Sequence, residues 1–374
     1  GARPFTLEAR SCIFPAVKQN LILMAGQEAL SRIMDGGLHP DDVKLMAGAA
    51  GGPKWLIFGH LDRYLFGSFF QSRKEPLYLI GSSSGAWRFA SASQADPLAA
   101  IQRFEDAYIG QTYEGIPTPV EVSAEADKIV THLLGKQGTR EILSHPFLRL
   151  CFMTARARGW TGSEQRVKLF AGLCMAVLGN FVSRRFLGWF FERGLFYDPR
   201  DVPPFAGMQG LPLHRIQLAP ENLGKGLLAS GSIPWVMAGV KDIPGAPAGT
   251  YRDGGVTDYQ MDIPFLNGQD GIVLYPHYQE RIIPGWLDKK IAWRKPNATN
   301  MANVLLLAPS PEFVESLPDK KIPDRDDFYT YKGRDKERID KWKQAVEISL
   351  RLVDEFVETV ESGKIKQIVQ PLLL

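Results

Sequence analysis

Apolar residues along the chain recur in two spacings, one typical of helices and one typical of buried strands. The clearest helical spacing lies at 336–361, where apolar residues recur every three or four positions and define one buried stripe. Gly363 follows this stretch, and glycine often ends a helix because it adopts a left-handed backbone without strain. We therefore expect one long helix near the C-terminus. Its apolar positions are Ile339, Trp342, Val346, Leu350, Val353, Phe356 and Val360.

Short apolar runs alternate with further helical segments through much of the chain. Runs of this length are typical of strands that are buried on both faces of a parallel sheet. The predicted strands lie at 43–47, 77–80, 215–218, 271–275 and 303–307. The predicted helices lie at 27–35, 55–66, 84–93, 97–108, 124–134 and 167–193. The alternation predicts an α/β protein: a three-layer α/β/α sandwich with a mostly parallel central sheet.

No repeat or low-complexity linker divides the sequence, so we expect residues 1–374 to form a single domain. The segment 117–201 has a mostly helical pattern and is predicted to be a helical insertion or cap within that domain. Within it, 147–158 contains three arginines, and we expect this stretch to be a solvated or ion-paired edge.

The composition is that of an ordinary globular protein. Hydrophobic residues make up 45% of the chain and charged residues 23%, which excludes a disordered chain, a collagen-like chain and a coiled coil. The formal net charge is +3, which is too small to indicate nucleic acid as the main partner. Nothing in the sequence determines the oligomeric state.

Cysteine and histidine usage points away from disulfides and metal sites. The three cysteines form no C-x-x-C pair, and the six histidines form no H-E-x-x-H or H-x-H pair, so neither a metal site nor a cofactor is expected. An odd number of cysteines favours a reducing compartment, and we expect a cytoplasmic protein, with membrane association and secretion left open. The longest uncharged apolar stretch, 169–182, is too short to cross a bilayer.

A G-x-S-x-G pentapeptide carries the strongest chemical signal. Gly81 and Gly85 flank Ser83 between a predicted strand and a helix of small residues. In this context the glycines leave room for a sharp turn that lifts the serine to the carboxyl end of the sheet, at the positive end of a helix dipole. Ser83 is therefore the candidate nucleophile. The alternative is a tight strand-to-helix turn without chemistry.

A second glycine-rich turn, 48–54, also lies between a predicted strand and a helix. A Walker A loop would need Ser or Thr after its Lys, but Trp55 follows Lys54. The better interpretation is an oxyanion hole formed by the backbone amides of Gly51 and Gly52, because glycines let N–H groups converge on one anion. A simple helix-start turn remains the alternative.

Downstream, Asp253 precedes Gly254 and Gly255, a pattern that alone more often marks a tight turn than a catalytic site. Taken with the two earlier turns, however, the chain resembles the patatin-like phospholipase family over about 44–264. The resemblance rests on the glycine-rich turn with its basic residue, the G-x-S-x-G elbow about thirty residues later, the D-G-G turn, and the segment Gly231–Pro234, which resembles the family's S-x-I-P segment.

This resemblance implies a serine–aspartate dyad, with Ser83 as nucleophile, Asp253 as its general base and no histidine. It implies that Gly51 and Gly52 form the oxyanion hole and that the other glycines of the two turns, Gly81, Gly85, Gly254 and Gly255, support them. Lys54 could contact an anionic head group or simply face solvent. The chain departs from the family at Ala50 and Trp55, where glycines are usual, and Trp55 is expected to close one pocket wall or move the turn.

The implied activity is that of a lipid acyl hydrolase, a phospholipase or esterase that cleaves carboxylic esters of a lipid or a small ester. Two alternatives remain: a catalytically inactive lipid- or protein-binding module with the same fold, and a thioesterase or polyester depolymerase that uses the same dyad.

The segment 167–193 combines bulky apolar residues with basic edges. Such a helix can lie in a bilayer interface and bind anionic lipid. We expect instead a helical cap that buries its apolar surface over the active site, and we keep peripheral membrane contact as the alternative.

Overall fold

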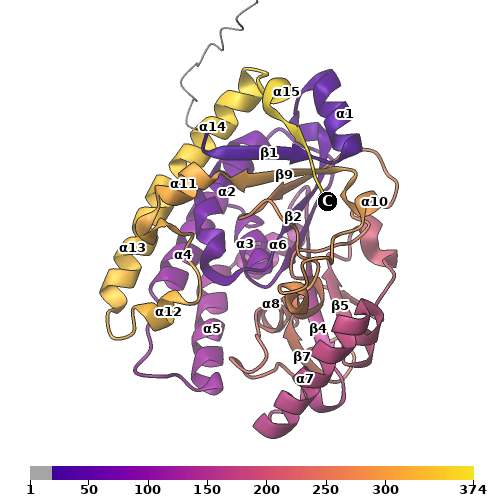
Figure 1. Ribbon diagram of the computed structural model, residues 1–374, viewed down its shortest axis with the longest axis vertical. Coiled ribbons are helices and arrows are strands. Elements are labelled where there is room, and N and C mark those ends of the chain that lie inside the picture. The colour runs from indigo at the N-terminus through magenta and orange to yellow at the C-terminus, as the bar shows by residue number, and fades with distance from the viewer. Residues whose placement is uncertain (1–18) are drawn as a thin grey trace, which may run out of the picture.

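The computed structural model describes residues 19–374, which are built around one ten-stranded sheet (Figure 1). The strands are β1 (Leu21–Ala25), β2 (Val43–Gly48), β3 (Leu77–Ser82), β4 (Leu148–Ala157), β5 (Phe191–Tyr197), β6 (Leu213–Gln217), β7 (Thr250–Asp253), β8 (Ile272–Pro276), β9 (Val304–Pro309) and β10 (Gln370–Pro371). Their order is β10-β1-β9-β8-β2-β3-β4-β5-β6, with β7 paired to β4 beside this path. The first eighteen residues of the predicted domain, including Cys12, lie outside the described residues.

Most neighbouring strands run parallel. The pairs β1–β9, β4–β5 and β4–β7 are antiparallel, and the other paired strands run in the same direction. The prediction of an α/β fold with a mostly parallel sheet is therefore confirmed. Each of the five predicted strands overlaps an observed one, and five strands that we did not predict, β1, β4, β5, β7 and β10, complete the sheet.

Helices flank the sheet. They are α1 (Gln27–Gly36), α2 (Gly59–Tyr64), α3 (Ser84–Ala92), α4 (Pro97–Ile109), α5 (Pro119–Leu134), α6 (Gly138–Ser144), α7 (Arg166–Val182), α8 (Leu223–Ser230), α9 (Gly255–Asp258), α10 (Ala298–Met301), α11 (Pro311–Glu315), α12 (Asp327–Thr330), α13 (Asp335–Ile348), α14 (Leu350–Glu361) and α15 (Ile365–Ile368). Figure 1 shows α1, α14 and α15 near β1 at one end of the molecule and α7 at the opposite end.

The long C-terminal helix is divided in two. The predicted helix 336–361 is α13 followed by α14, and Ser349 lies at the junction. The Ser349 hydroxyl donates a hydrogen bond of 2.6 Å to the carbonyl of Val346. Serine side chains that bond back to the preceding turn compete with regular helix geometry, which explains a break that the apolar stripe does not reveal.

The prediction that 117–201 is a helical insertion or cap is wrong in part, because this segment supplies β4 and β5 to the sheet. We expected 147–158 to be a solvated or ion-paired edge; its arginines are indeed ion-paired, but the segment is a buried central strand and not an edge. Arg149 reaches Asp201 at 2.5 Å and Arg156 reaches Glu192 at 2.6 Å. Acids later in the chain thus pair with the arginines while the apolar side chains of β4 fill the core.

The predicted helix 167–193 is also shorter than expected. α7 ends at Val182, a short 3-10 turn follows, and Phe191 begins β5. The Ser183 hydroxyl accepts the Arg185 N–H at 3.3 Å, which starts that new turn. Most bulky apolar side chains of α7 are exposed to solvent, so the expectation of a buried apolar cap is wrong for this helix.

The pairing of β4 positions two distant parts of the chain. β3 and β7 approach β4 from opposite directions, since β3 is parallel and β7 antiparallel to it. Ser82, the last residue of β3, pairs with Met153, and Asp253, the last residue of β7, pairs with Thr154. Because Met153 and Thr154 are consecutive, the carboxyl ends of β3 and β7 meet head to head.

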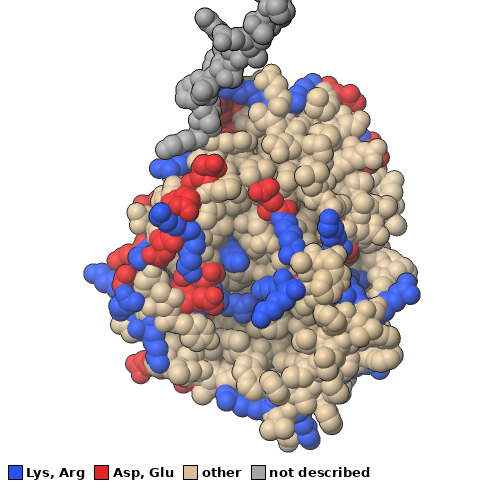
Figure 2. Space-filling model, viewed as in Figure 1, with Lys and Arg blue, Asp and Glu red and all other residues tan. Residues whose placement is uncertain are grey.

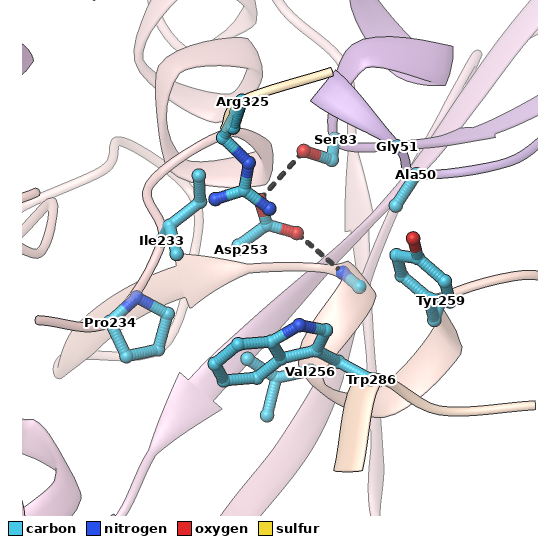
Figure 3. Close-up of a pocket in the computed structure, with 11 residues that line it drawn as sticks. Ala50, Gly51, Ser83, Ile233, Pro234, Asp253, Val256, Tyr259, Trp286 and Arg325 are labelled. Atoms are coloured by element: carbon cyan, nitrogen blue, oxygen red, sulfur yellow. Dashed lines mark hydrogen bonds between the residues drawn. The ribbon is translucent and has the colours of Figure 1, made fainter. Parts of the chain in front are cut away.

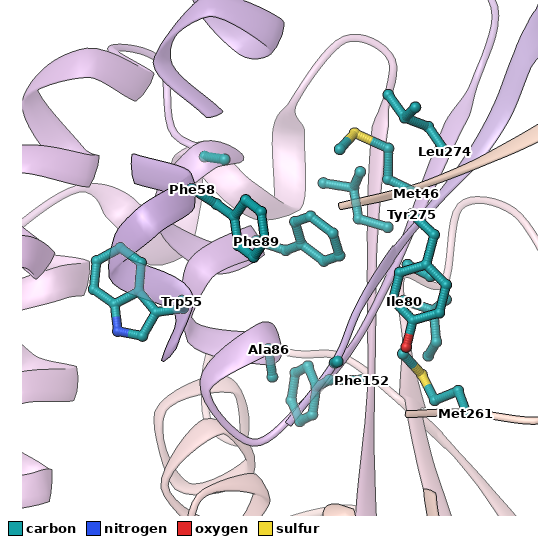
Figure 4. Close-up of a cluster of buried hydrophobic side chains, with 14 of the residues drawn as sticks. Met46, Trp55, Phe58, Ile80, Ala86, Phe89, Phe152, Met261, Leu274 and Tyr275 are labelled. Carbon is teal, nitrogen blue, oxygen red and sulfur yellow. The ribbon is translucent and has the colours of Figure 1, made fainter. Parts of the chain in front are cut away.

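The core between the sheet and α3 is rich in aromatic residues (Figure 4). Trp55 stacks on Phe104 with ring centroids 4.2 Å apart and is 3% exposed. It therefore packs into this core, and it is not one of the residues that line the pocket described below. The expectation that Trp55 closes a pocket wall is wrong, because its ring finds aromatic partners on α4 instead.

None of the helices in residues 19–374 combines the length and hydropathy that crossing a membrane requires. Over the same residues, no cluster of His, Cys, Asp or Glu side chains is arranged to hold a metal ion.

Candidate active site

Ser83 occupies a sharp turn between β3 and α3. Its backbone has φ 55° and ψ −125°, a conformation that non-glycine residues rarely adopt. Gly85 must be a glycine here because a Cβ would collide with the carbonyl oxygen of Gly48 on β2, and Gly81 packs with similar closeness against Ala86. The strained turn holds the Ser83 side chain at the carboxyl end of the sheet, as a nucleophile requires.

A second serine holds this turn in place. The Ser83 N–H donates to the Ser230 hydroxyl oxygen at 3.0 Å, and the Ser230 hydroxyl donates to the carbonyl of Met153 at 2.7 Å. Ser230 is the last residue of α8 and is fully buried. It thereby links the elbow to β4, the strand that also positions β7.

Asp253 lies in direct contact with Ser83. The Ser83 hydroxyl donates a hydrogen bond of 2.6 Å to Oδ2 of Asp253, and the Gly255 N–H donates one of 2.7 Å to Oδ1 (Figure 3). Gly254 lies so close to β4 that a Cβ would collide with the carbonyl oxygen of Met153. The D-G-G turn therefore lets the chain pass close over β4, so that the Gly255 N–H can bond to the Asp253 carboxylate.

Burial changes the acidity of Asp253. Its side chain is almost completely enclosed, and this burial raises its pKa to about 6, even though the bonds from Ser83 and Gly255 and the charges of Arg325 and Lys289 act in the opposite direction. A carboxylate with this pKa is largely ionised at neutral pH and remains a better proton acceptor than an ordinary aspartate.

The amides of Gly51 and Gly52 have no hydrogen-bond acceptor among residues 19–374. Gly51 lines the pocket beside Ser83, whereas Gly52 follows it with a left-handed φ of 57°. The neighbouring Ala50 differs, since its N–H donates to the carbonyl of Tyr259 at 2.8 Å. The amides of Gly51 and Gly52 are thus available to a ligand, and that of Ala50 is not.

A small pocket opens above the dyad. Its free space is about 20 Å³, room for about one water molecule. Aromatic and apolar side chains surround the Ser83 hydroxyl and the Asp253 carboxylate, and the segment 231–234 contributes Ile233 and Pro234 (Figure 3). The lining consists of Ala50, Gly51, Ser83, Ile233, Pro234, Asp253, Gly255, Val256, Tyr259, Trp286 and Arg325.

Three cations surround the pocket. Arg325 lines it, Lys54 Nζ lies 4.8 Å from the centre of the Tyr278 ring, and Lys289 Nζ lies 4.4 Å from the centre of the Tyr259 ring. Partial burial, with the charges of Arg325 and Lys54, lowers the pKa of Lys289 to about 8. Figure 2 shows Lys and Arg gathered around the hollow in the middle of this face.

The structure thus brings together most of the site residues predicted from the sequence. Ser83, Asp253 and Gly51 meet in one pocket, and Gly52 follows directly. Lys54 lies against an aromatic ring and is not among the pocket-lining residues. Sequence reasoning missed Ser230 and Arg325. A buried serine that ends a helix and an arginine in a polar loop carry no local pattern that would have revealed them.

A scan against models of known protein families and a search of curated proteins found no match to this chain. The chemistry of the pocket therefore rests on its geometry and on the motif resemblance described above.

Proposed function

We propose that this protein is a serine acyl hydrolase of the patatin-like type, which cleaves carboxylic esters through an acyl-enzyme on Ser83. The observation that carries the proposal is the 2.6 Å hydrogen bond between the Ser83 hydroxyl and Asp253 at a strained strand-to-helix elbow. A serine hydroxyl is a weak nucleophile until a base accepts its proton, and here a buried carboxylate lies within reach of that proton.

Each group then has one role in the reaction. Asp253 Oδ2 accepts the Ser83 proton while Ser83 Oγ forms a bond to the carbonyl carbon. The carbonyl oxygen becomes an oxyanion, which accepts hydrogen bonds from the Gly51 and Gly52 amides; one such donor is typically worth about 10²–10³ in rate. When the C–O bond to the leaving group breaks, Asp253 returns the proton to the departing alcohol.

Water completes the cycle. Asp253 accepts a proton from a water molecule while the oxygen of that water attacks the acyl carbon. The bond between Ser83 Oγ and the acyl carbon then breaks, Asp253 returns the proton to Ser83, and the carboxylic acid is released. The Gly255 amide bonds to Oδ1, so Oδ2 is directed toward the serine throughout. The dyad needs no histidine and no cofactor for these steps.

The substrate class follows from the motif resemblance and from the apolar pocket wall, both of which favour a lipid ester. We place the whole described chain in one patatin-like domain whose sheet and helices form a three-layer sandwich. We assign the protein to the cytoplasm and propose no nucleic-acid partner.

A fluorophosphonate probe tests the proposed nucleophile. We expect covalent labelling of the wild type and none of Ser83→Ala. Ser82→Ala is the matched control, since its buried hydroxyl lies one residue away and has no hydrogen-bond partner within the described chain. A folded wild type that takes up no label would favour the inactive binding module instead.

Substrate assays separate the remaining alternatives. With p-nitrophenyl esters, acyl-CoA and phospholipid vesicles as parallel substrates, we expect ester cleavage that depends on Ser83. Preference for acyl-CoA would point to a thioesterase, and equal turnover in Ser83→Ala would contradict the assignment of the nucleophile.

A further inference from the structure

Helix α7 exposes an unusual number of large apolar side chains. Of its residues only Leu169, Gly172, Ala176 and Asn180 are buried. Monomeric proteins rarely leave contiguous apolar surface of this kind in water, and such surfaces commonly mark a binding site. The exposed side chains are Val167, Phe170, Met175, Val177, Leu178, Phe181 and Val182, and we call them the α7 surface.

Tryptophans extend the α7 surface at both ends. Trp235 packs against Phe170 with ring centroids 6.0 Å apart, and Trp293 packs against Phe181 at 5.6 Å. Both tryptophans are exposed to solvent, and Trp235 is held with a positive φ of 73°. Tryptophan is the residue most characteristic of membrane interfaces, where one part of its ring is apolar and the N–H remains hydrated.

The charged side chains of α7 and of the turn that follows it have one sign. No Asp or Glu occurs in 165–191, whereas Arg166, Lys168 and Arg185 are exposed and form no ion pair within residues 19–374. Figure 2 shows a mostly uncharged area over α7 with Lys and Arg at its margin. An apolar face with a basic margin matches an anionic lipid surface.

The α7 surface is rigidly attached to the rest of the protein. Buried Asp288 accepts hydrogen bonds from Asn180 at 2.7 Å, Arg184 at 3.0 Å and Arg294 at 2.9 Å. Gly172 packs against Thr161 so closely that a Cβ there would lie 2.8 Å from its backbone nitrogen. These contacts fix which face of α7 points inward, so the apolar side chains cannot be buried by a simple rotation of the helix.

The α7 surface also begins next to the candidate active site. Trp235 directly follows Pro234, which lines the pocket, and Asp288 lies two residues after Trp286 of the pocket wall. A bilayer that receives the α7 surface therefore also lies beside the rim of the pocket.

We propose that the α7 surface docks this protein onto a membrane that contains anionic lipid. Charge favours a bilayer over a second copy of the chain: two copies of the same face brought together about a two-fold axis would oppose their basic margins. The proposal concerns binding and does not depend on the proposed hydrolysis.

Vesicle flotation tests this proposal, with Ser83→Ala as the background so that hydrolysis does not alter the lipid. We expect binding to phosphatidylcholine vesicles that contain phosphatidylglycerol, and weaker binding to phosphatidylcholine alone. The triple substitution Leu178→Asn, Phe181→Asn and Val182→Asn should reduce the affinity roughly tenfold or more, because it removes apolar contacts without opening the core. The matched control is Ile116→Asn, Val120→Asn and Tyr329→Asn, which changes equally exposed apolar residues elsewhere and should leave the affinity unchanged.

Substitution of the basic margin separates charge from apolar contact. Each of Arg166→Gln, Lys168→Gln and Arg185→Gln should weaken binding to anionic vesicles roughly fivefold, and high salt should do the same to the parent. Absence of vesicle binding, or equal binding by the α7 triple variant and its parent, would overturn the proposal. A parent that dimerises in analytical ultracentrifugation and fails to float, while the triple variant is monomeric, would assign the surface to a second copy instead. If the wild type has no esterase activity, these outcomes keep their meaning, because they measure binding alone.

Discussion

Two buried carboxylates five residues apart, Asp253 and Asp258, have very different surroundings. Asp258 accepts two hydrogen bonds from the Arg193 guanidinium, at 2.9 and 2.8 Å, and Arg184 lies 3.9 Å away. Asp253 has a hydroxyl and an amide as its partners, and no Lys or Arg side chain among residues 19–374 bonds to it directly. The arginines beside Asp258 balance the charge of its carboxylate. The carboxylate of Asp253 has no such partner in the described chain and remains free to accept a proton.

The difference shows that a buried carboxylate can serve either to hold the structure together or to accept a proton. A carboxylate paired with arginine keeps its charge and fixes the positions of the chains around it. A carboxylate that is buried without such a partner has a raised pKa and faces a proton donor, here Ser83. We therefore expect substitution of Asp253 to reduce turnover and substitution of Asp258 to reduce stability.

The largest effect is expected on turnover. Asp253→Asn should reduce kcat on the order of 10⁴-fold while the protein stays folded, because the amide occupies the same space but cannot accept the Ser83 proton. Ester hydrolysis and circular dichroism measure the two properties. Turnover close to that of the wild type would mean that another group acts as the base.

The second effect is on stability. Asp258→Asn should lower the free energy of unfolding by about 3–5 kcal/mol, because it leaves the buried Arg193 charge without its partner. Urea unfolding measures this value. Asp253→Asn is the matched comparison and should not destabilise the protein; the opposite ranking of the two variants would contradict the division of roles.

The third effect is on pH dependence. Since Asp253 must be ionised to act and its pKa is about 6, kcat/KM should fall about tenfold per pH unit below pH 6. A group whose folded pKa is raised above its unfolded value of about 3.8 adds stability that is present below pH 4 and is lost as pH rises through 6, about 3 kcal/mol in all. Asp253→Asn should abolish this change in urea unfolding. A rate profile that is flat between pH 5 and 7 would contradict the raised pKa.

The smallest effect concerns Arg325. Its charge lowers the pKa of Asp253, so Arg325→Gln should move the acidic limb of the rate profile to higher pH, by less than about one unit. Lys343→Gln makes the same change of charge at an exposed site and should leave the limb in place. A shift to lower pH would show that Arg325 does not stabilise the ionised carboxylate.

The sequence was most informative where structure is decided locally. The strand at 77–80, the elbow and the helix behind Ser83 are specified by neighbouring apolar and small residues, and they lie where they were predicted. The contact between Ser83 and Asp253 joins residues 170 positions apart, and only the resemblance to a family pointed to it. Arg325 lies in a loop where no periodicity exists to reveal it.

Other features depend on partners that a local pattern cannot identify. The arginines of β4 resemble a surface edge until Asp201 and Glu192 are placed beside them. The sequence shows that α7 is rich in apolar residues, but it does not show whether protein or solvent faces them. Only the position of the helix at one end of the sheet shows that most of them face outward.

The head-to-head meeting of β3 and β7 on β4 has a consequence for how activity arises. Neither half of the dyad can find the other until both strands have joined the same central neighbour, and that requires contacts between distant parts of the polypeptide, which form slowly. Chemical competence should therefore be among the last properties that a refolding molecule acquires. Under the proposed function, a nascent chain that has not yet extended past residue 253 would carry Ser83 without the carboxylate that activates it, and would be inactive for that reason.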